Sequence, residues 1–352
     1  MAVKVLDDYY LAITAIITIG YQLIFFSVSY GFQIDSVTDF GGGSNVAILA
    51  ILTLIFCQTW YVRQIVATIF AVIWGVRLGL FCLYRMLKSG HDSRFDNIRG
   101  SFKSLLFFYI FQMMWVWTIS LPVIFLNSPR ISGKEEAGKD VEFGSVTDII
   151  GIIIFSIGIL IESIADIQKF VFRQRRTSPV QFINTGLWAW SRHPNYFGEM
   201  MVRFYGRTGM FLLCLQPTIT GVGTNAAYAS IASPAFTIFI LMFLSGMPLN
   251  ERPAHEKQWK NGNWPEYSKH LKRTSVLIPF PPFLYEPLPQ IIKSTLFLEF
   301  PIYRFVPDSE SRGLAKNDTN VDDTNGEGTN GDGANRDGAG SDGVGDGENN
   351  NS

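Results

Sequence analysis

Long apolar runs separated by short polar segments constrain this chain more than any other feature of its sequence. A helix needs roughly 17–25 apolar residues to cross a bilayer, and several segments are about that long. We predict seven membrane-spanning helices, at Tyr10–Phe32, Val46–Val62, Ile65–Leu87, Leu105–Leu126, Val146–Val171, Phe197–Leu215 and Ile231–Leu249. So many spans leave no room for a separate soluble catalytic domain. The expected fold is therefore an all-α integral membrane bundle.

The two ends of the chain differ in composition. Hydrophobic residues make up 47% of the sequence, but from about Asp308 onward the chain is a run of Gly, Asn, Asp and Thr without apolar periodicity. Such a composition buries too little apolar surface to offset the entropy of folding. We therefore expect a membrane domain over residues 1–300 and an acidic, disordered tail over residues 301–352.

Lysine and arginine are distributed unequally between the two sides that seven crossings would define. One side receives basic clusters at residues 85–103, 173–192 and 252–273, and the other receives Lys4, Arg63 and a mixed-sign loop at 130–139. Cytoplasmic loops carry the excess of positive charge, so the basic side and the C-terminus are predicted to be cytosolic. The same side would hold a loop containing Asp39 and Gly41–Gly43. The endoplasmic reticulum is the expected membrane.

Charged residues also fall inside the predicted spans, with Arg77 in the third and Glu162 and Asp166 in the fifth. A charge at the membrane centre costs about 2.5–3.5 kcal/mol, so each of these residues needs a partner or a water-filled cavity. Glu162 and Asp166 are four residues apart and share one helix face, which continues to Arg173. Two interpretations stay open: a structural ion pair with Arg77, or the wall of a polar pocket that opens to the cytosol.

The segment from Trp190 to Glu199 is unusually polar for such an apolar chain. It places Arg192, His193, Asn195, Tyr196 and Glu199 within ten residues, a pattern that predicts a polar ligand. His193 precedes a proline, and a positioning role is favoured because no second histidine or cysteine supports metal or nucleophilic chemistry. The three cysteines all lie in apolar spans, so neither a disulfide framework nor a metal site is expected.

Six sequence blocks in order support a resemblance to a known family. They are Trp74–Leu78, His91–Arg99, Glu162–Lys169, Ser191–Glu199, Gly246–Arg252 and Arg273–Pro279. Over about residues 39–282 the chain resembles the steroid 5-alpha-reductase-like membrane reductases of the C-terminal-domain superfamily, in the branch whose substrates are mostly unassigned. The resemblance implies a seven-helix bundle that holds NADPH in a cytosol-facing cavity. It also implies reduction of a carbon–carbon double bond conjugated to a carbonyl in a lipid or steroid-like substrate.

The resemblance also implies which residues contact the cofactor. The expected cofactor-binding residues are Asp166, Arg173, Arg192, Asn195, Glu199, Tyr267 and Arg273. The three arginines are expected at phosphate groups, because a guanidinium pairs with phosphate oxygens through two parallel hydrogen bonds.

The catalytic proton donor is where the chain departs from the best-known steroid reductases. Those enzymes use an acidic residue with a glutamine near the second span, and a tyrosine that polarises the substrate carbonyl. Here Gln58 and Tyr61 lie in the corresponding region without a neighbouring carboxylate. This argues against a steroid substrate and leaves Tyr61, Tyr84 and Tyr196 as candidate donors. The segment from Phe204 to Gly209 is expected to line the lipid entrance.

Two other functions remain alternatives. Isoprenylcysteine carboxyl methyltransferases also carry an Arg-His-Pro-x-Tyr-x-Gly stretch, which would make the chain an S-adenosylmethionine-dependent membrane methyltransferase. A non-catalytic membrane lipid-binding protein could have kept the same bundle. The expected partners are the membrane and a lipid-like small molecule, and no nucleic acid. Retention of NADPH, S-adenosylmethionine or neither on purification would distinguish the three functions.

Overall fold

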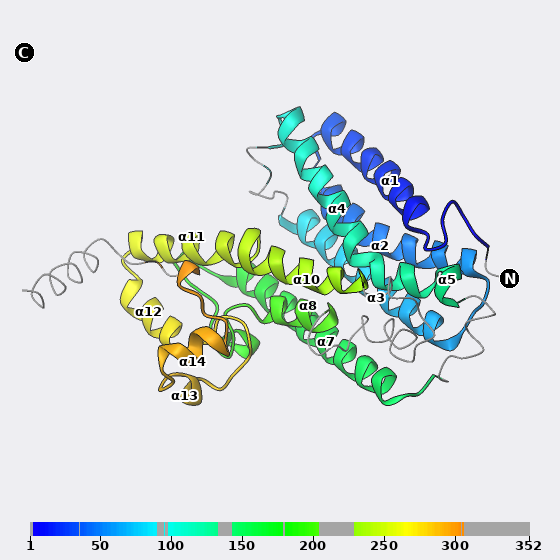
Figure 1. The fold of residues 1–352 in the computed structure, drawn as a ribbon. Helices are drawn as coiled ribbons and strands as arrows, with labels where there is room; N and C mark the ends of the chain where they lie inside the picture. Colours follow the sequence, from blue (N-terminus) through cyan, green and yellow to red (C-terminus); the bar gives the residue numbers. More distant parts are fainter. Residues whose placement is uncertain are drawn as a thin grey trace, which may run out of the picture. The chain divides into compact units, whose positions relative to one another are not determined.

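The structure is a computed structural model, and it describes residues 3–34, 36–89, 95, 98–132, 143–178, 180–203, 229–303 and 305. The ordered elements are α1 (Leu11–Phe32), α2 (Ser36–Cys57), α3 (Val62–Ser89), α4 (Phe102–Leu126), α5 (Pro129–Ser132), α7 (Val146–Arg175), η2 (Gly186–Ala189), α8 (Pro194–Arg203), α10 (Ala232–Phe239), η4 (Ile240–Leu244), α11 (Met247–Lys260), α12 (Trp264–Arg273), α13 (Pro282–Tyr285), α14 (Gln290–Thr295) and η5 (Pro301–Tyr303), as Figure 1 shows. Within these residues the fold is all-helical, with isolated bridges but no strand.

Six helical segments among the described residues are long and apolar enough to cross a membrane. They are Leu11–Phe32, Val37–Cys57, Val62–Lys88, Phe102–Ser132, Val146–Arg175 and Ala229–Lys260. Their outward faces carry exposed apolar side chains such as Ile24, Phe107 and Leu160, as expected for contact with lipid. The chain is therefore an integral membrane protein. The predicted span at Phe197–Leu215 begins within α8, and its residues from 204 onward lie outside the described part.

The second predicted span was wrong at both ends. We expected a helix at Val46–Val62 after a glycine-rich loop, but α2 runs over Ser36–Cys57 and includes Asp39 and Gly41–Gly43. A Cβ atom added at Gly43 would lie 2.5 Å from the carbonyl oxygen of Gly75 in α3. These glycines therefore serve close helix packing, as small residues do between membrane helices, and they do not form a loop.

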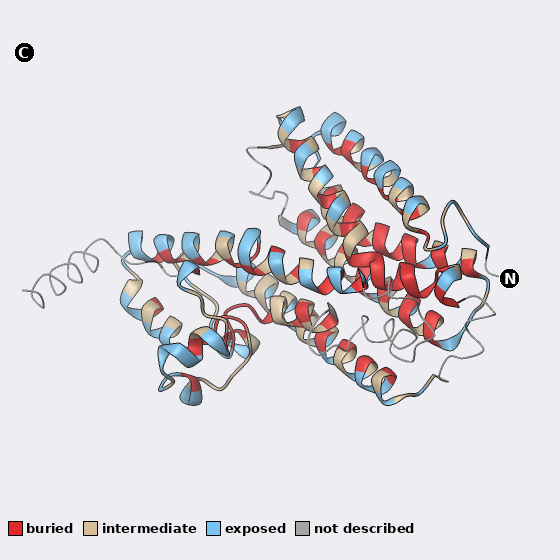
Figure 2. Ribbon diagram, in the orientation of Figure 1, coloured by how far each residue is buried: buried red, intermediate tan, exposed pale blue. Residues whose placement is uncertain are grey.

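The core forms where α2, α3 and α4 meet. The buried cluster there includes Leu49, Trp74, Val116 and Ile119, and Phe155 of α7 also belongs to it. Figure 2 shows the buried residues on the facing sides of these helices, with exposed residues along the outer side of α1. The bundle thus buries one side of each helix and leaves the other side for lipid.

The relative directions of α3, α7 and α8 determine where their polar residues meet. Arg63 pairs with Asp148 and Arg77 pairs with Glu162, so α3 and α7 run parallel with a constant offset of 85 residues. A Cβ atom added at Gly198 would lie 2.6 Å from the backbone nitrogen of Glu162, and one added at Gly158 would lie 2.9 Å from that of Val202, so α8 runs antiparallel to α7. This close approach brings the first turns of α8 against the polar face of α7.

Beyond the last span, α12, α13 and α14 form a small C-terminal lobe. The backbone nitrogen of Arg192 donates to the carbonyl of Ser275 at 2.8 Å, and that of Phe280 donates to Trp190 at 3.1 Å. These bonds hold the segment after α12 against the chain that enters α8. The apolar sequence Leu277–Pro282 therefore turns back against the bundle, as its composition suggests.

Candidate functional site

Six side chains from three helices form what we call the intramembrane cluster. They are Trp74 and Arg77 of α3, Glu162 and Asp166 of α7, and Asn195 and Glu199 of α8.

Arg77 lies at the centre of this cluster. Its Nη1 donates to Glu162, and its Nη2 donates to Asp166 at 2.5 Å. Asn195 Nδ2 donates to the other oxygen of Asp166 at 3.3 Å, and Trp74 Nε1 donates to Glu199 at 3.2 Å. The structure thus forms the ion pair with Arg77, one of the two interpretations that the sequence left open. The wall of a polar pocket stays a prediction, because neither Glu162 nor Asp166 lines either of the two pockets described below.

The intramembrane cluster has more acceptors than its own donors satisfy. Three carboxyl groups surround one guanidinium, and the carboxyl group of Glu199 lies close to those of Glu162 and Asp166. Glu162 Oε2 and Asn195 Oδ1 are buried and accept no hydrogen bond from the residues that the structure describes. Because buried polar groups in folded proteins are nearly always paired, these atoms are suited to a ligand that brings hydrogen-bond donors or positive charge.

A basic pocket of about 190 Å³ lies next to the intramembrane cluster along α7. Its lining carries four cationic side chains: Lys169, Arg173, Arg176 and Lys257. Lys169 follows Asp166 by three residues, which places it about one helical turn away. The ammonium group of Lys169 lies 4.9 Å from the ring centre of Trp188. This basic pocket has the charge needed to bind phosphate groups.

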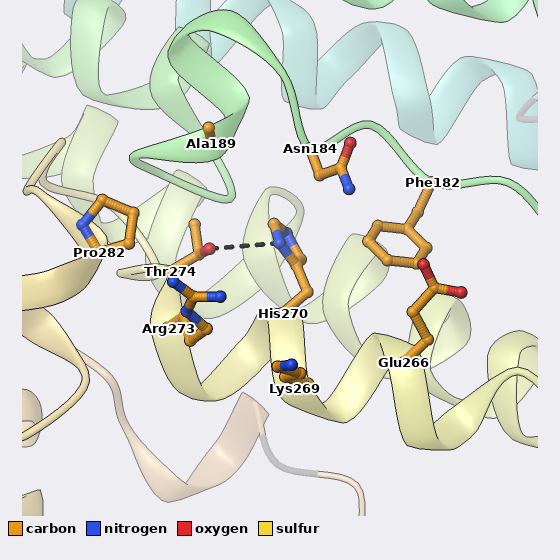
Figure 3. A pocket seen from close by; sticks show the side chains of 9 residues that line it. All are labelled: Phe182, Asn184, Ala189, Glu266, Lys269, His270, Arg273, Thr274 and Pro282. Carbon is orange, nitrogen blue, oxygen red and sulfur yellow. Dashed lines mark hydrogen bonds between the residues drawn. The ribbon is translucent and has the colours of Figure 1, made fainter.

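Two further predicted site residues lie at pockets. Tyr267 lines the basic pocket, and burial raises the pKa of its hydroxyl above the ordinary range. Arg273 lines a second pocket, the lobe pocket, of about 390 Å³ in the C-terminal lobe (Figure 3). Its guanidinium also pairs with Glu286 at 3.1 Å. Phe182 lines both pockets, so the two share a wall.

Arg192 and His193 belong to a separate buried network. Arg192 Nη1 contacts Glu251 at 2.5 Å and its Nη2 contacts Glu299 at 3.0 Å, while His193 Nε2 lies 2.7 Å from Glu251. Burial alone would lower the pKa of Arg192, but the two carboxylates hold it above the ordinary value. Burial lowers the pKa of His193, although the hydrogen bond to Glu251 opposes the shift.

The network around Glu251 changes the expected role of Arg192. Its guanidinium is buried and paired with two carboxylates of the protein itself, so the geometry favours a structural role over a phosphate contact. The positioning role expected for His193 agrees with its contact to the same carboxylate.

The three candidate tyrosines lie in different surroundings. The hydroxyl of Tyr196 accepts a hydrogen bond from Asn250 at 2.8 Å, and its ring stacks on His193 at 5.1 Å. Tyr84 is exposed and its ring lies 5.5 Å from that of Phe170. Tyr61 precedes Arg77 by 16 residues, which is about 24 Å at the helical rise. The structure therefore brings neither Tyr61 nor Tyr84 to the intramembrane cluster.

Some residues of these sites were not singled out by sequence reasoning. Trp74 and Glu251 lie within two of the quoted sequence blocks, so a closer reading of those blocks could have found them. Glu299 and Phe182 gave no signal, because each acts through contacts with distant parts of the chain. The segment from Phe204 to Gly209, expected at a lipid entrance, lies outside the described residues.

Comparisons with known proteins bear on the family alone. No curated protein and no solved structure matches the chain. A family model matches residues 25–271, a range that includes the intramembrane cluster and all four cations of the basic pocket but stops before Arg273 and Glu299. The chain therefore belongs to the family that this model describes, DUF1295, a family of proteins of unknown function.

Proposed function

We propose that this protein is a membrane-embedded oxidoreductase that uses NADPH to reduce a carbon–carbon double bond conjugated to a carbonyl in a lipid-like substrate. The observation that carries the proposal is the position of the basic pocket, one helical turn along α7 from the acceptor-rich intramembrane cluster. A dinucleotide has phosphates at its centre and a carboxamide-bearing ring at one end. It therefore needs these two environments side by side.

The residues present fit such a cofactor. Lys169, Arg173, Arg176 and Lys257 would hold its phosphates, since charge-assisted hydrogen bonds to phosphate oxygens are among the strongest in proteins. Glu162 Oε2 and Asn195 Oδ1, which accept no hydrogen bond within the described part of the chain, would receive hydrogen bonds from its carboxamide and ribose hydroxyls. When bound, the cofactor supplies a hydride to the double bond.

The protein's own contribution is alignment and exclusion of water. Trp74 and Glu162 are fully or almost fully buried, and both lie in helices that are long and apolar enough to span a membrane, whose core excludes bulk water. Hydride addition to the β carbon leaves an enolate, which then takes a proton to complete the reduction; Tyr196, which follows Asn195 of the cluster in α8, is the proposed proton donor. A lipid would reach the cluster directly from the bilayer. The sequence resemblance to membrane reductases points to the same chemistry.

Methyl transfer from S-adenosylmethionine is the second candidate. Its positively charged sulfonium and ammonium groups would suit the three carboxyl groups near Arg77, which is the observation in its favour. However, S-adenosylmethionine has no phosphate and would leave the four cations of the basic pocket without a role. A non-catalytic lipid carrier would leave both environments without a role.

Titration of the purified, full-length protein with each cofactor tests the proposal. NADPH should bind, with a change in its fluorescence, and S-adenosylmethionine should not displace it. Arg173→Gln and Lys257→Gln should each weaken NADPH binding about tenfold, as expected for loss of one charge-assisted hydrogen bond. Arg252→Gln is the matched control, because Arg252 is exposed on α11 and does not line the basic pocket.

Two results would overturn the proposal. One is binding of S-adenosylmethionine without binding of NADPH, which would favour the methyltransferase. The other is NADPH binding that Arg173→Gln, Lys257→Gln and Arg252→Gln leave equally unchanged. The substrate class would then be sought by comparing lipids from cells with and without the protein, where an unsaturated precursor should accumulate without it.

A further inference from the structure

The lobe pocket is twice the size of the basic pocket, and the proposed nicotinamide and phosphate contacts do not use it. Its volume is about 390 Å³, and it forms between the segment around Phe182, helix α12 and the start of α13. The lining residues are Phe182, Asn184, Ala189, Glu266, Lys269, His270, Arg273, Thr274 and Pro282 (Figure 3).

The inner surface of the lobe pocket is suited to a flat ring. The rings of Phe182 and His270 lie 5.1 Å apart at 41°, and Ala189 and Pro282 add apolar surface. Aromatic faces stack on any nucleobase. Figure 3 shows the amide of Asn184 on the same side as Phe182, where it could pair with the edge of a ring.

The polar groups of the lobe pocket are divided between a neutral interior and a charged rim. Burial lowers the pKa of His270 to about 4, so its imidazole is uncharged near neutral pH, and its Nδ1 lies 3.2 Å from the hydroxyl of Thr274. Lys269 and Arg273 are exposed and place positive charge at the rim, with Glu266 and Glu286, which pairs with Arg273 at 3.1 Å, as opposing carboxylates. The lining therefore suits a neutral ring that carries an anionic group at its outer end.

We propose that the lobe pocket binds the adenosine end of the dinucleotide, with Lys269 and Arg273 contacting its 2′-phosphate. The inference rests on the proposed function and adds an orientation to it. Because Phe182 lines both pockets, the cofactor would run from the lobe pocket, past Phe182 and through the basic pocket, to the intramembrane cluster. The 2′-phosphate contact would also make the protein selective for NADPH over NADH.

Adenosine 2′,5′-bisphosphate is the direct probe, because it carries the adenosine end without the nicotinamide. Calorimetric titration of the full-length protein in detergent should show binding. Lys269→Met should weaken it about tenfold by removing a charge-assisted contact, and Phe182→Leu should weaken it to a similar extent by removing a stacking face. Leucine keeps apolar volume beside Tyr267, whose ring lies 5.0 Å from that of Phe182, so folding should be retained.

Two controls locate the effect. Lys272→Met removes an exposed lysine from the same helix that does not line the lobe pocket, and it should leave the probe's affinity unchanged. Asn195→Ala should weaken NADPH but leave adenosine 2′,5′-bisphosphate unaffected, because Asn195 lies at the other end of the proposed path. Lys269→Met should also reduce the preference for NADPH over NADH.

Each contrary outcome identifies which idea fails. If NADPH binds but Lys269→Met and Phe182→Leu change neither the probe's affinity nor the preference over NADH, the lobe-pocket inference is overturned and the proposed function stands. If the probe binds as expected but no substrate is reduced with NADPH, the pocket assignment stands and the reductase fails. If neither NADPH nor the probe binds, both are overturned.

Discussion

Two arginine–carboxylate pairs join the same two helices at the same offset of 85 residues, yet they differ in how completely they are satisfied. Arg63 meets Asp148 through two hydrogen bonds of 2.9 and 3.0 Å. The same carboxylate also accepts from Ser145 and from the backbone of Gly144, closing a capping box at the start of α7. In this closed pair each carboxylate oxygen accepts a hydrogen bond from Arg63.

The second pair, four helical turns along, is open. Arg77 binds both Glu162 and Asp166, and Glu199 lies close by as a third carboxyl group. Among the described residues, Glu162 Oε2 accepts no hydrogen bond. A closed buried pair contributes to a defined structure, whereas an open cluster keeps acceptors for another molecule. Two arginine–carboxylate contacts between the same two helices can therefore have different roles. The number of carboxyl groups around each arginine distinguishes the structural contact from the candidate ligand site.

Breaking the closed pair should produce the largest effect on stability. Asp148→Ala removes the carboxylate that two nitrogens of the buried Arg63 contact and also removes the helix cap, so the free energy of unfolding should fall by about 3–5 kcal/mol. Denaturant titration in mixed micelles would measure the loss. NADPH affinity of the protein that remains folded should be unchanged. An unaltered stability, or a selective loss of cofactor binding, would remove the distinction between the two pairs.

His270 of the C-terminal lobe should make the stability of the protein depend on pH. The pKa of His270 is lowered from 6.5 to about 4, so the unfolded chain binds more protons than the folded protein between these values. The free energy of unfolding should therefore fall as pH drops from about 6.5 to about 4, by at most about 3 kcal/mol from this residue. His193 shifts in the same direction.

The difference between the wild type and His270→Gln isolates this contribution, because other groups titrate in both proteins. The wild type should lose more stability than the variant across the window. Parallel curves would mean that His270 is protonated equally in the folded and unfolded states.

Substitutions in the open cluster should weaken NADPH binding more than they reduce stability, the reverse of the result expected for the closed pair. Asn195→Ala removes a polar contact while leaving apolar packing intact, and should weaken NADPH binding by about 1–3 kcal/mol. The stability midpoint should move far less than in Asp148→Ala. Fluorescence titration in detergent measures the first quantity and denaturation the second. Full affinity in both Asn195→Ala and Glu199→Ala would make this cluster structural as well.

Removal of the acidic segment after about Asp308 should have the smallest effect. Its sequence has only scattered apolar residues, too few to pack on the bundle, so insertion and turnover per folded molecule should be unchanged. A large drop in turnover that fades with added salt would indicate that the segment reaches the cations of the basic pocket.

The sequence predicted the chemistry of the open cluster better than that of the closed pair. Arg77, Glu162 and Asp166 lie deep in apolar runs, where the cost of an unpaired charge requires partners. Arg63 and Asp148 lie near the ends of spans, where charges are common, so nothing indicated that they pair. The contact of Arg192 with Glu299 joins residues 107 positions apart, and single-residue reasoning had no means of finding it.

The accuracy of the predicted helix ends depended on the sequence rule that was applied to each helix. Glycines break helices in water, and that rule misplaced the start of α2, although Gly43 allows two membrane helices to touch. The helices α1, α3, α4 and α7 lie close to their predicted ranges. Their apolar runs are long enough to define a membrane span whatever single residues lie at their ends.

The offset of 85 residues between the paired arginines and acids also sets an order of events during synthesis. At about 5–20 residues per second, α7 emerges roughly 4–17 seconds after α3. During that interval Arg77 lies in an apolar helix, and its partners Glu162 and Asp166 have not yet been synthesised. Until they arrive, α3 can settle only against the insertion machinery or near the lipid headgroups. The arrival of α7 should therefore be the step that commits α3 to its final depth in the membrane.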